Sequence, residues 1–213
     1  MRKIKLVIFD LDGTLIDAYA AIYSSFNYVM RKLDLKSKSP ELIRRSVGWG
    51  DANLLKPYVS EHDLGRALRL YRNHHKLSLL RQSRLYPYVK PLLCKLKIRG
   101  FKLAVASNRP SRFSLILLKH LRIIGLFDYV LCADKLKRGK PDPAILNKII
   151  KNFSLKKSQV LYVGDMVIDA QAGRRAKVKT IIVTSGSSGI AEIKREHPFK
   201  IISGVRQLEK IVD

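Results

Sequence analysis

The chain is poor in acidic residues, cysteine and tryptophan, and it has no long hydrophobic run. Its 213 residues include 17 Asp and Glu, two cysteines and one tryptophan. Cys94 and Cys132 lie far apart in apolar contexts, which predicts buried free thiols in a reducing cytoplasm. No apolar run approaches the roughly 18 residues of a membrane span, so we expect no membrane partner. The apolar stretch before Asp10 is also too short for the apolar region of a signal peptide. These observations favour a cytoplasmic location.

The shortage of acidic residues leaves a strongly basic chain. There are 42 Lys and Arg against 17 Asp and Glu, which gives a formal net charge of +25. Such a surface attracts anions and binds nucleic acid non-specifically through phosphate contacts. The basic residues are spread along the chain, however, so specific nucleic-acid binding is not favoured. A nucleic-acid-binding protein without catalysis is therefore the alternative from another functional class.

Apolar runs of strand length alternate with helix-like stretches along most of the chain. The predicted strands are 4–9, 101–106, 129–133, 160–163, 179–184 and 199–202. The predicted helices between them include 88–99, 111–124, 142–152 and 167–176. This alternation predicts βαβ units and a parallel sheet of the α/β class, and the continuous apolar character of the strands fits burial on both faces. In such a sheet, ligands bind beyond the carboxyl ends of the strands.

One segment interrupts the alternation. From about Asp17 to Leu85 there is no convincing strand, and the pattern predicts only helices, at 18–33, 40–47, 51–58 and 61–82. These helices either form a separate unit inserted after the first strand or extend the core.

The first predicted strand ends in a pair of carboxylates, within Asp10-Leu11-Asp12-Gly13-Thr14. Two carboxylates two residues apart point the same way if the strand continues, and they are costly to hold together without a cation or a shared proton. The pattern therefore predicts a metal-assisted nucleophile beside a general acid, with a simple turn as the alternative. A calcium loop is disfavoured, because apolar residues follow Thr14 where oxygen ligands should continue.

Three further polar motifs follow later strands. They are Ser107-Asn108, Lys140-Pro141-Asp142-Pro143 and Gly164-Asp165, the last with Asp169 four residues further on. With the Asp10 motif, this ordered set resembles the haloacid dehalogenase superfamily of aspartate-nucleophile phosphatases. The run from Gly164 to Gly173 is most similar to phosphoglycolate phosphatases and their relatives that act on small phosphoesters.

The resemblance implies a Rossmann-like parallel sheet as the core domain (1–16 and 86–213) and an inserted α-helical cap domain (17–85). It also implies an enzyme, a phosphoric monoester hydrolase that uses Mg²⁺ and an aspartyl-phosphate intermediate. The substrate would be a small phosphorylated metabolite, such as phosphoglycolate or a sugar phosphate. The protein would be a monomer or a homodimer.

The same resemblance assigns roles to individual residues. Asp10 would be the nucleophile, and Asp12 the general acid and then the general base. The metal ligands would be the side chains of Asp10 and Asp165 and the backbone carbonyl of Asp12, with support from Asp169. The residues that hold the transferring phosphoryl group would be Thr14, Ser107, Asn108 and Lys140.

Substrate specificity would come from the cap. Two glycines flank the only tryptophan in Gly48-Trp49-Gly50, which predicts a loop that presents an aromatic ring to the cleft, with packing between cap helices as the alternative. Arg44 or Arg45 could meet a second anionic group on the substrate, although a position on the helix surface is favoured for each.

Other members of the superfamily fit less well. Ala18 and Ile22 stand at the positions where the mutases of this superfamily have a hydroxyl-bearing residue and a histidine. The dehalogenases lack an aspartate at the position of Asp12. A phosphotransferase or mutase, or a pyrophosphatase, is the remaining catalytic alternative. Lys177 stands where the relatives have a helix-ending glycine, which leaves the local helix end open.

Overall fold

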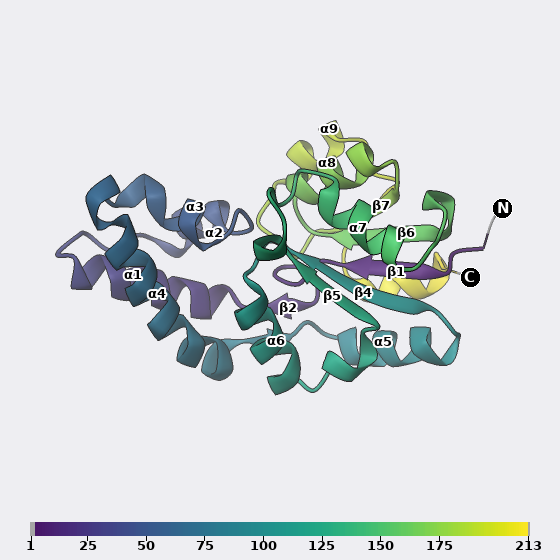
Figure 1. Ribbon diagram of the computed structural model, residues 1–213, viewed down its shortest axis with the longest axis horizontal. Helices are drawn as coiled ribbons and strands as arrows, with labels where there is room; N and C mark the ends of the chain where they lie inside the picture. The colour runs from purple at the N-terminus through teal and green to yellow at the C-terminus, as the bar shows by residue number, and fades with distance from the viewer. Residues whose placement is uncertain (1–2, 213) are drawn as a thin grey trace.

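The computed structural model describes residues 3–212 and contains a six-stranded sheet (Figure 1). The strands are β1 (Leu6–Phe9), β4 (Lys102–Ser107), β5 (Tyr129–Cys132), β6 (Val160–Gly164), β7 (Lys179–Val183) and β8 (Lys200–Ile202). Their order in the sheet is β5-β4-β1-β6-β7-β8, and every pair is parallel. This arrangement confirms the predicted α/β class.

Helices cover both faces of the sheet, because successive side chains of each strand point to opposite faces. In β1, Leu6 and Ile8 join one hydrophobic core, whereas Val7 and Phe9 join the other. The first core includes α7 and α8, and the second includes α5 and α6, so the strands are apolar throughout (Figure 1). The covering helices are α5 (Val89–Ile98), α6 (Ser111–His120), α7 (Ala144–Asn152), α8 (Val167–Ala176) and α9 (Ile190–Arg195).

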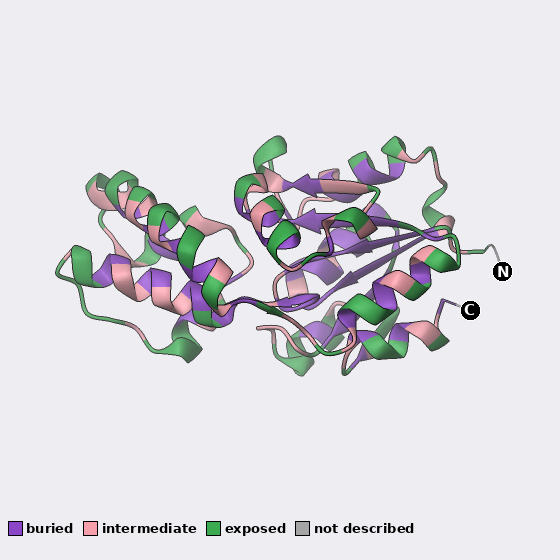
Figure 2. Ribbon diagram, turned by 90° about the horizontal axis from the view of Figure 1, so that it is seen from below, coloured by how far each residue is buried: buried purple, intermediate pink, exposed green. Residues whose placement is uncertain are grey.

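The inserted segment forms a group of helices at one end of the molecule, away from most of the sheet (Figure 2). Its members are α1 (Tyr19–Lys32), α2 (Pro40–Ser46), α3 (Asp51–Leu55), the 3₁₀ turn η1 (Lys56–Tyr58) and α4 (Glu61–Gln82). We call these helices the α1–α4 group. Helix α4 begins after Ser60, whose Oγ accepts a hydrogen bond from the backbone N–H of Asp63 at 3.0 Å. The boundaries of the core and cap domains stay a prediction.

The expectation of no strand between Asp17 and Leu85 is wrong at the two ends of that segment. Strands β2 (Ile16–Asp17) and β3 (Arg84–Leu85) pair in antiparallel fashion and connect the α1–α4 group to the rest of the chain. Two residues are too few to show the alternating pattern by which a strand is recognised in a sequence.

Two other differences concern helices. Helix α6 ends at His120 instead of 124, because Arg122 adopts a left-handed conformation with φ of 55° and a 3₁₀ turn, η2 (Ile124–Leu126), follows. The short α9 was not expected from the sequence. The remaining 3₁₀ turns are η3 (Ala133–Lys135), η4 (Lys157–Gln159) and η5 (Val205–Lys210).

The two cysteines differ in burial. Cys132 is buried as predicted, but Cys94 is half-buried, so the prediction of two buried thiols is wrong for Cys94. Its helix α5 turns Leu92, Leu93 and Leu96 into the core and leaves Cys94 at the margin. Within residues 3–212, no helix combines the length and the apolar character that crossing a membrane requires.

Lys177 ends α8 in the left-handed conformation that glycine adopts most readily, with φ of 58° and ψ of 44°. The Lys177 side chain is exposed, so the strain is not offset by packing.

We expect Lys177→Gly to stabilise the protein by about 1 kcal/mol, because a side chain in this conformation costs roughly 1–2 kcal/mol. The melting temperature should rise by about 2–4 °C. The control is Lys177→Ala, which removes the charge but keeps the strain and should change stability by less than about 0.5 kcal/mol. Equal melting temperatures for Lys177→Gly and Lys177→Ala would contradict this account.

Candidate active site

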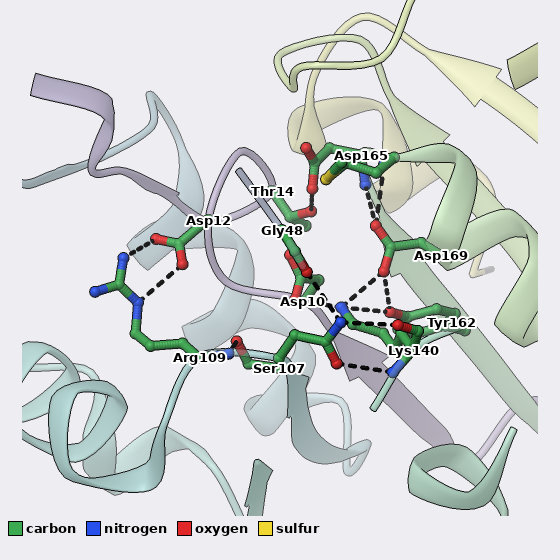
Figure 3. A network of polar contacts seen from close by, with 12 residues as sticks. Asp10, Asp12, Thr14, Gly48, Ser107, Arg109, Lys140, Tyr162, Asp165 and Asp169 are labelled. Atoms are coloured by element: carbon green, nitrogen blue, oxygen red, sulfur yellow. Dashed lines mark hydrogen bonds and ion pairs between the residues drawn. The ribbon is translucent and has the colours of Figure 1, made fainter. Parts of the chain in front are cut away.

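The carboxyl ends of three neighbouring strands bring the sequence motifs together. Phe9 of β1 is in register with Val105 of β4 and with Val163 of β6. Asp10 follows β1 directly, while Ser107-Asn108 and Gly164-Asp165 stand at the ends of β4 and β6. Residues more than 90 positions apart in the chain are therefore neighbours at one edge of the sheet (Figure 3).

Lys140 is the centre of a buried network of polar contacts. Its Nζ donates to Asp10 Oδ1 at 2.5 Å and to Asp169 Oδ1 at 2.7 Å, and it lies 3.2 Å from the hydroxyl of Tyr162 (Figure 3). All four side chains are buried. Burial alone would lower the pKa of Lys140, but the charges of Asp10 and Asp169 outweigh it and raise that pKa. The ammonium group is thus held in its charged form between two carboxylates.

Asp169 has no free oxygen. Its Oδ1 accepts from Lys140 and, at 2.5 Å, from the Tyr162 hydroxyl. Its Oδ2 accepts from the backbone N–H groups of Asp165 and Met166 at 3.1 and 3.0 Å, at the start of α8. Because both oxygens are engaged, Asp169 is suited to hold Lys140 and the start of α8 in place.

Asp165, in contrast, has an unpaired oxygen. Its Oδ1 accepts from Thr14 Oγ1 at 3.0 Å, whereas its Oδ2 is buried without a hydrogen-bond partner among residues 3–212. Two glycines surround this oxygen: a Cβ on Gly13 would lie 2.3 Å from Oδ2, and one on Gly186 would lie 1.9 Å from it. Only glycine at both positions leaves room around the unpaired oxygen.

The buried charges at this edge do not balance. Asp10, Asp165 and Asp169 carry three negative charges when ionised and Lys140 carries one positive charge, which leaves −2. Burial raises the pKa of Asp10 to about 7 although Lys140 opposes the shift, and burial with the charges of Asp169 and Asp10 raises the pKa of Asp165 well above its ordinary value. One oxygen from each of the three carboxylates lies within 4.8 Å of the others. Hard oxygen donors with this charge fit a divalent cation such as Mg²⁺.

Asp12 lies apart from this network and pairs with Arg109. The guanidinium donates from Nε to Asp12 Oδ2 at 2.8 Å and from Nη2 to Asp12 Oδ1 at 2.6 Å (Figure 3). The third contact of Arg109 joins its Nη1 to His75 Nε2, on α4, at 3.0 Å. The first two carboxylates of the chain thus have different cationic partners.

His75 is held as a neutral ring. Its Nδ1 lies 3.0 Å from Ser25 Oγ, which itself donates to the carbonyl of Ala21 at 2.8 Å. The serine hydroxyl therefore accepts from Nδ1–H, and Nε2 accepts from Arg109. Burial and the charge of Arg109 lower the pKa of His75 well below its ordinary value. A chain of hydrogen bonds thus runs from Asp12 into the α1–α4 group.

Ser107 and Asn108 contribute differently from each other. Ser107 Oγ is buried and accepts from the backbone N–H of Arg109 at 3.1 Å, which leaves its own proton for a ligand. The Asn108 side chain donates to the carbonyls of Gly48 and Lys140 and accepts from the Lys140 N–H, all within 2.9 Å. Asn108 thus holds two loops together beside the predicted phosphoryl site.

Residues of the inserted segment and of the sheet edge line a cavity of about 60 Å³. Asp10, Asp12, Ser107, Asn108, Lys140 and Asp169 line it together with Gly48 and Gly50. Trp49 does not: the residue is 44% exposed and lines a separate hollow beside Arg45 and Ser187. The loop 48–50 therefore offers backbone, and not its aromatic ring, to this cavity.

Arg44 is not on the helix surface as the sequence favoured. Its Nη2 donates to the carbonyls of Ser185 and Gly186 at 2.9 and 3.0 Å, and its guanidinium stacks 4.3 Å from the ring of Tyr19. Arg44 thus links α2 to the loop that covers Asp165.

Sequence reasoning missed Arg109, His75 and Tyr162. Tyr162 lies within an apolar strand, so the sequence indicates only a core position for it. His75 lies on an apolar face of α4. One feature of the sequence could have identified Arg109 as a site residue: it follows Asn108 directly, just after the end of β4.

Comparison with known proteins assigns the family. The model of the haloacid dehalogenase-like hydrolases matches residues 7–183. The chain belongs to this family. It is 32% identical to a phosphoglycolate phosphatase of Pseudomonas fluorescens, covering 97% of the chain and 79% of the relative. It is 34% identical to a phosphoglycolate phosphatase of Nitrosospira multiformis, over 86% of the chain and 84% of the relative.

A solved structure supports the same assignment. The crystal structure of a predicted phosphoglycolate phosphatase from Haemophilus somnus covers 100% of both chains with a TM-score of 0.94 at 29% identity. The predicted resemblance and the prediction of a phosphoric monoester hydrolase are confirmed. The protein is a haloacid dehalogenase-like phosphatase.

The neutral state of His75 should make stability depend on pH. Because the pKa of His75 is lowered in the folded protein, the unfolded chain takes up a proton first as pH falls below about 6.5. The contribution of the neutral His75 to the free energy of unfolding is therefore fully present above that pH. It is lost below that pH, by up to about 1.4 kcal/mol per pH unit. His75→Gln keeps an acceptor for Arg109 but does not titrate. Urea unfolding at roughly pH 7.5 and 5.5 should show a smaller loss for this variant than for the parent protein. Equal losses in both proteins would show that His75 does not titrate on unfolding.

Proposed function

We propose that the protein is a Mg²⁺-dependent phosphatase that hydrolyses small phosphomonoesters through an aspartyl-phosphate on Asp10. The observation that carries this proposal is the cluster of three buried carboxylates, Asp10, Asp165 and Asp169, around one ammonium group, with the unpaired Oδ2 of Asp165 in a space that two glycines leave open. The proposed metal ligands are the side chains of Asp10 and Asp165 and the backbone carbonyl of Asp12. When bound, the cation would neutralise charge on the transferring phosphoryl group.

The first half-reaction would use Asp10 as nucleophile. A carboxylate oxygen of Asp10 bonds to phosphorus, and the bond from phosphorus to the ester oxygen breaks. Protonated Asp12 gives its proton to that leaving oxygen, so an alcohol departs. Lys140 and the hydroxyl of Ser107 stabilise the phosphoryl oxygens by charge and hydrogen bonding.

The second half-reaction would return the enzyme to its starting state. Asp12, now a carboxylate, takes a proton from water while the water oxygen bonds to phosphorus. The bond between phosphorus and Asp10 breaks, inorganic phosphate leaves, and Asp12 is again protonated. Thr14 would hold Asp165 in place, and Asp169 would hold Lys140, through the hydrogen bonds described above.

The proposed cap, residues 17–85, limits the size of the substrate. A cavity of about 60 Å³ accommodates only a small molecule, and closure of the proposed cap would exclude water from the phosphoryl group. Phosphoglycolate, the substrate named for the relatives, and small sugar phosphates are the first compounds to test. A phosphotransferase, mutase or pyrophosphatase would share the aspartyl intermediate. The cytoplasmic location, the monomeric or dimeric state and the absence of specific nucleic-acid binding stay predictions.

We expect hydrolysis of p-nitrophenyl phosphate and of a panel of phosphorylated metabolites to require Mg²⁺. A chelator in excess should abolish turnover, and added Mg²⁺ should restore it, because the single ammonium of Lys140 does not compensate three buried carboxylates. Release of inorganic phosphate is the measurement. Full activity in the presence of excess chelator would contradict the proposed role of the metal.

Substitution of the two carboxylates should separate their roles. Asp10→Asn removes the nucleophile and should abolish turnover, whereas Asp12→Asn removes proton transfer and should lower kcat by about 10²–10⁴-fold. Mass spectrometry of protein quenched during turnover should find phosphate on the peptide that contains Asp10. The control is Asp34→Asn, at an exposed left-handed position that asparagine tolerates, and it should leave kcat unchanged. Phosphate trapped on a different residue would overturn the assignment of the nucleophile.

A further inference from the structure

The amino ends of the strands form a basic edge of the sheet, opposite the candidate active site. They lie at the end of the molecule that is farthest from the α1–α4 group (Figure 1), and we call this end of the sheet the amino edge. Four of the six strands begin with a lysine or directly after one: Lys5 precedes β1, and Lys102, Lys179 and Lys200 begin β4, β7 and β8. All four lysines are exposed. The amino edge therefore holds positive charge that the proposed phosphatase does not use.

Helix dipoles do not account for these four lysines. Cations are stabilised at the carboxyl ends of helices, which explains Arg99 after α5 and Lys177 after α8. Strands have only small net dipoles, so the lysines that begin them gain no such stabilisation. Within residues 3–212, the only ion pair of the four is that of Lys102 with Asp128, at 3.3 Å. Like charges thus stand together on the strands with little compensation, which suits an anionic partner.

A hollow of about 460 Å³ opens at the amino edge beside β1 and β4. The described residues that line it include four cations and no acid; the cations are Lys3, Lys5, Arg99 and Lys102. Its other lining residues are mainly apolar and include the half-buried ring of Phe153. The hollow therefore combines several cations and an aromatic ring with no acidic side chain of its own.

The sheet itself fixes the backbone of this hollow. The backbone N–H of Lys5 donates to the carbonyl of Gln159 at 2.8 Å, and the N–H of Lys102 donates to the carbonyl of Lys5 at 2.9 Å. Lys102 is also in register with Leu6, the first residue of β1. The two lysines thus extend from a rigid element, so no loop has to become ordered when a ligand binds.

A second aromatic ring lies further along the amino edge. Phe199 directly precedes β8, and its backbone N–H donates to the carbonyl of Thr180 in β7 at 2.8 Å. Phe199 is 52% exposed, and the Nζ of Lys179 lies 4.7 Å from the centre of its ring. Only β6 separates β1 from β7, so this ring is about 10–15 Å from the hollow at the usual strand spacing. An exposed ring beside cations is the arrangement on which unpaired bases stack.

We propose that the amino edge binds single-stranded nucleic acid without sequence preference, with backbone phosphates in the hollow and a base on Phe199. The uncompensated lysines attract the phosphates. The exposed ring favours a strand whose bases are free to stack over a duplex, in which they already stack on one another. A lipid surface fits less well, because interfacial binding depends on buried apolar area and the exposed apolar side chain beside the hollow is Ile98 alone. This binding is independent of the proposed phosphatase function.

The test measures binding of a fluorescein-labelled single-stranded DNA of mixed sequence by anisotropy over a series of NaCl concentrations. The logarithm of the affinity should fall linearly with the logarithm of the salt concentration, by about 0.7 for each phosphate contact. A triple variant with Lys3→Gln, Lys5→Gln and Lys102→Gln should flatten this slope by about 2 and weaken binding at about 50 mM NaCl by roughly tenfold or more. Its melting temperature should stay close to that of the parent protein, because all three side chains are exposed.

The matched control removes the same charge from the opposite end of the molecule. Lys36→Gln, Lys56→Gln and Lys76→Gln change three exposed lysines of the inserted segment, so both triple variants have the same net charge. The control should keep the parent affinity within about twofold. Equal losses in the two triple variants would show that binding follows net charge alone, and they would overturn the assignment to the amino edge.

Phe199→Ala tests the stacking. It should weaken binding by about 5- to 150-fold and leave the salt slope unchanged, because it removes a ring and no charge. The control is Leu77→Ala, which truncates another exposed apolar side chain, on α4, and should not change the affinity. Unchanged affinity in Phe199→Ala would overturn the proposed place of the base.

Two further ligands distinguish single strands from other polyanions. At about 150 mM NaCl, where the electrostatic part of the affinity is reduced, a duplex of the same sequence should bind more weakly than the single strand. Equal or tighter binding of the duplex would overturn the proposal. Tighter binding to vesicles of phosphatidylserine and phosphatidylcholine, lost in the Lys3, Lys5 and Lys102 triple variant, would assign the amino edge to lipid instead. Absence of any binding to the single strand at about 50 mM NaCl would overturn the proposal outright, and the proposed phosphatase activity would stand.

Discussion

The contact of Lys140 with Asp10 and Asp169 is the interaction on which the rest of the site depends. Three buried carboxylates would repel one another strongly, and a single buried ammonium reduces that repulsion without cancelling it. Removing one partner of a buried pair typically costs about 3–5 kcal/mol, because the other charge is left uncompensated. The site is therefore stable enough to form in the folded chain and still deficient in positive charge. That deficit gives the proposed metal its binding energy and places it beside the proposed nucleophile.

The separation of Asp10 from Asp12 follows from the same constraint. The two residues are neighbours in the sequence, but Asp10 is directed to Lys140 and Asp12 to Arg109 (Figure 3). Gly13, with φ of 85°, turns the chain sharply after the pair and also leaves space for the unpaired oxygen of Asp165. Two different cationic partners thus place the two carboxylates in different environments.

The sequence predicted the sheet and its motifs well, because the signals are local. Buried parallel strands are continuous apolar runs, and the polar residues at their ends need only the sheet topology to come together. The sequence did not predict that Arg109 binds Asp12, since 97 residues separate them and neither has a spacing that indicates the other. Tyr162 was missed because a hydroxyl at the end of an aromatic ring does not change the burial pattern of a strand, and His75 was missed because it occupies a buried position on the apolar face of α4. Trp49, in contrast, was expected at the cavity and lies outside it. Its position depends on the path of its loop, which the sequence does not indicate.

The α1–α4 group contacts each part of the site through a different residue. Arg44 binds the carbonyls of the loop that covers Asp165, and the Gly48 carbonyl accepts from Asn108 beside the proposed phosphoryl site. His75 contacts Arg109, which holds Asp12. The proposed metal site, the proposed phosphoryl site and the proposed acid–base residue thus each have a hydrogen-bonded link to the inserted segment. In the proposed mechanism, a movement of these helices away from the sheet would break all three contacts, so closure of the cavity and assembly of the proposed catalytic groups would form a single event. The inserted segment would then act on the residues of the sheet edge by fixing their partners.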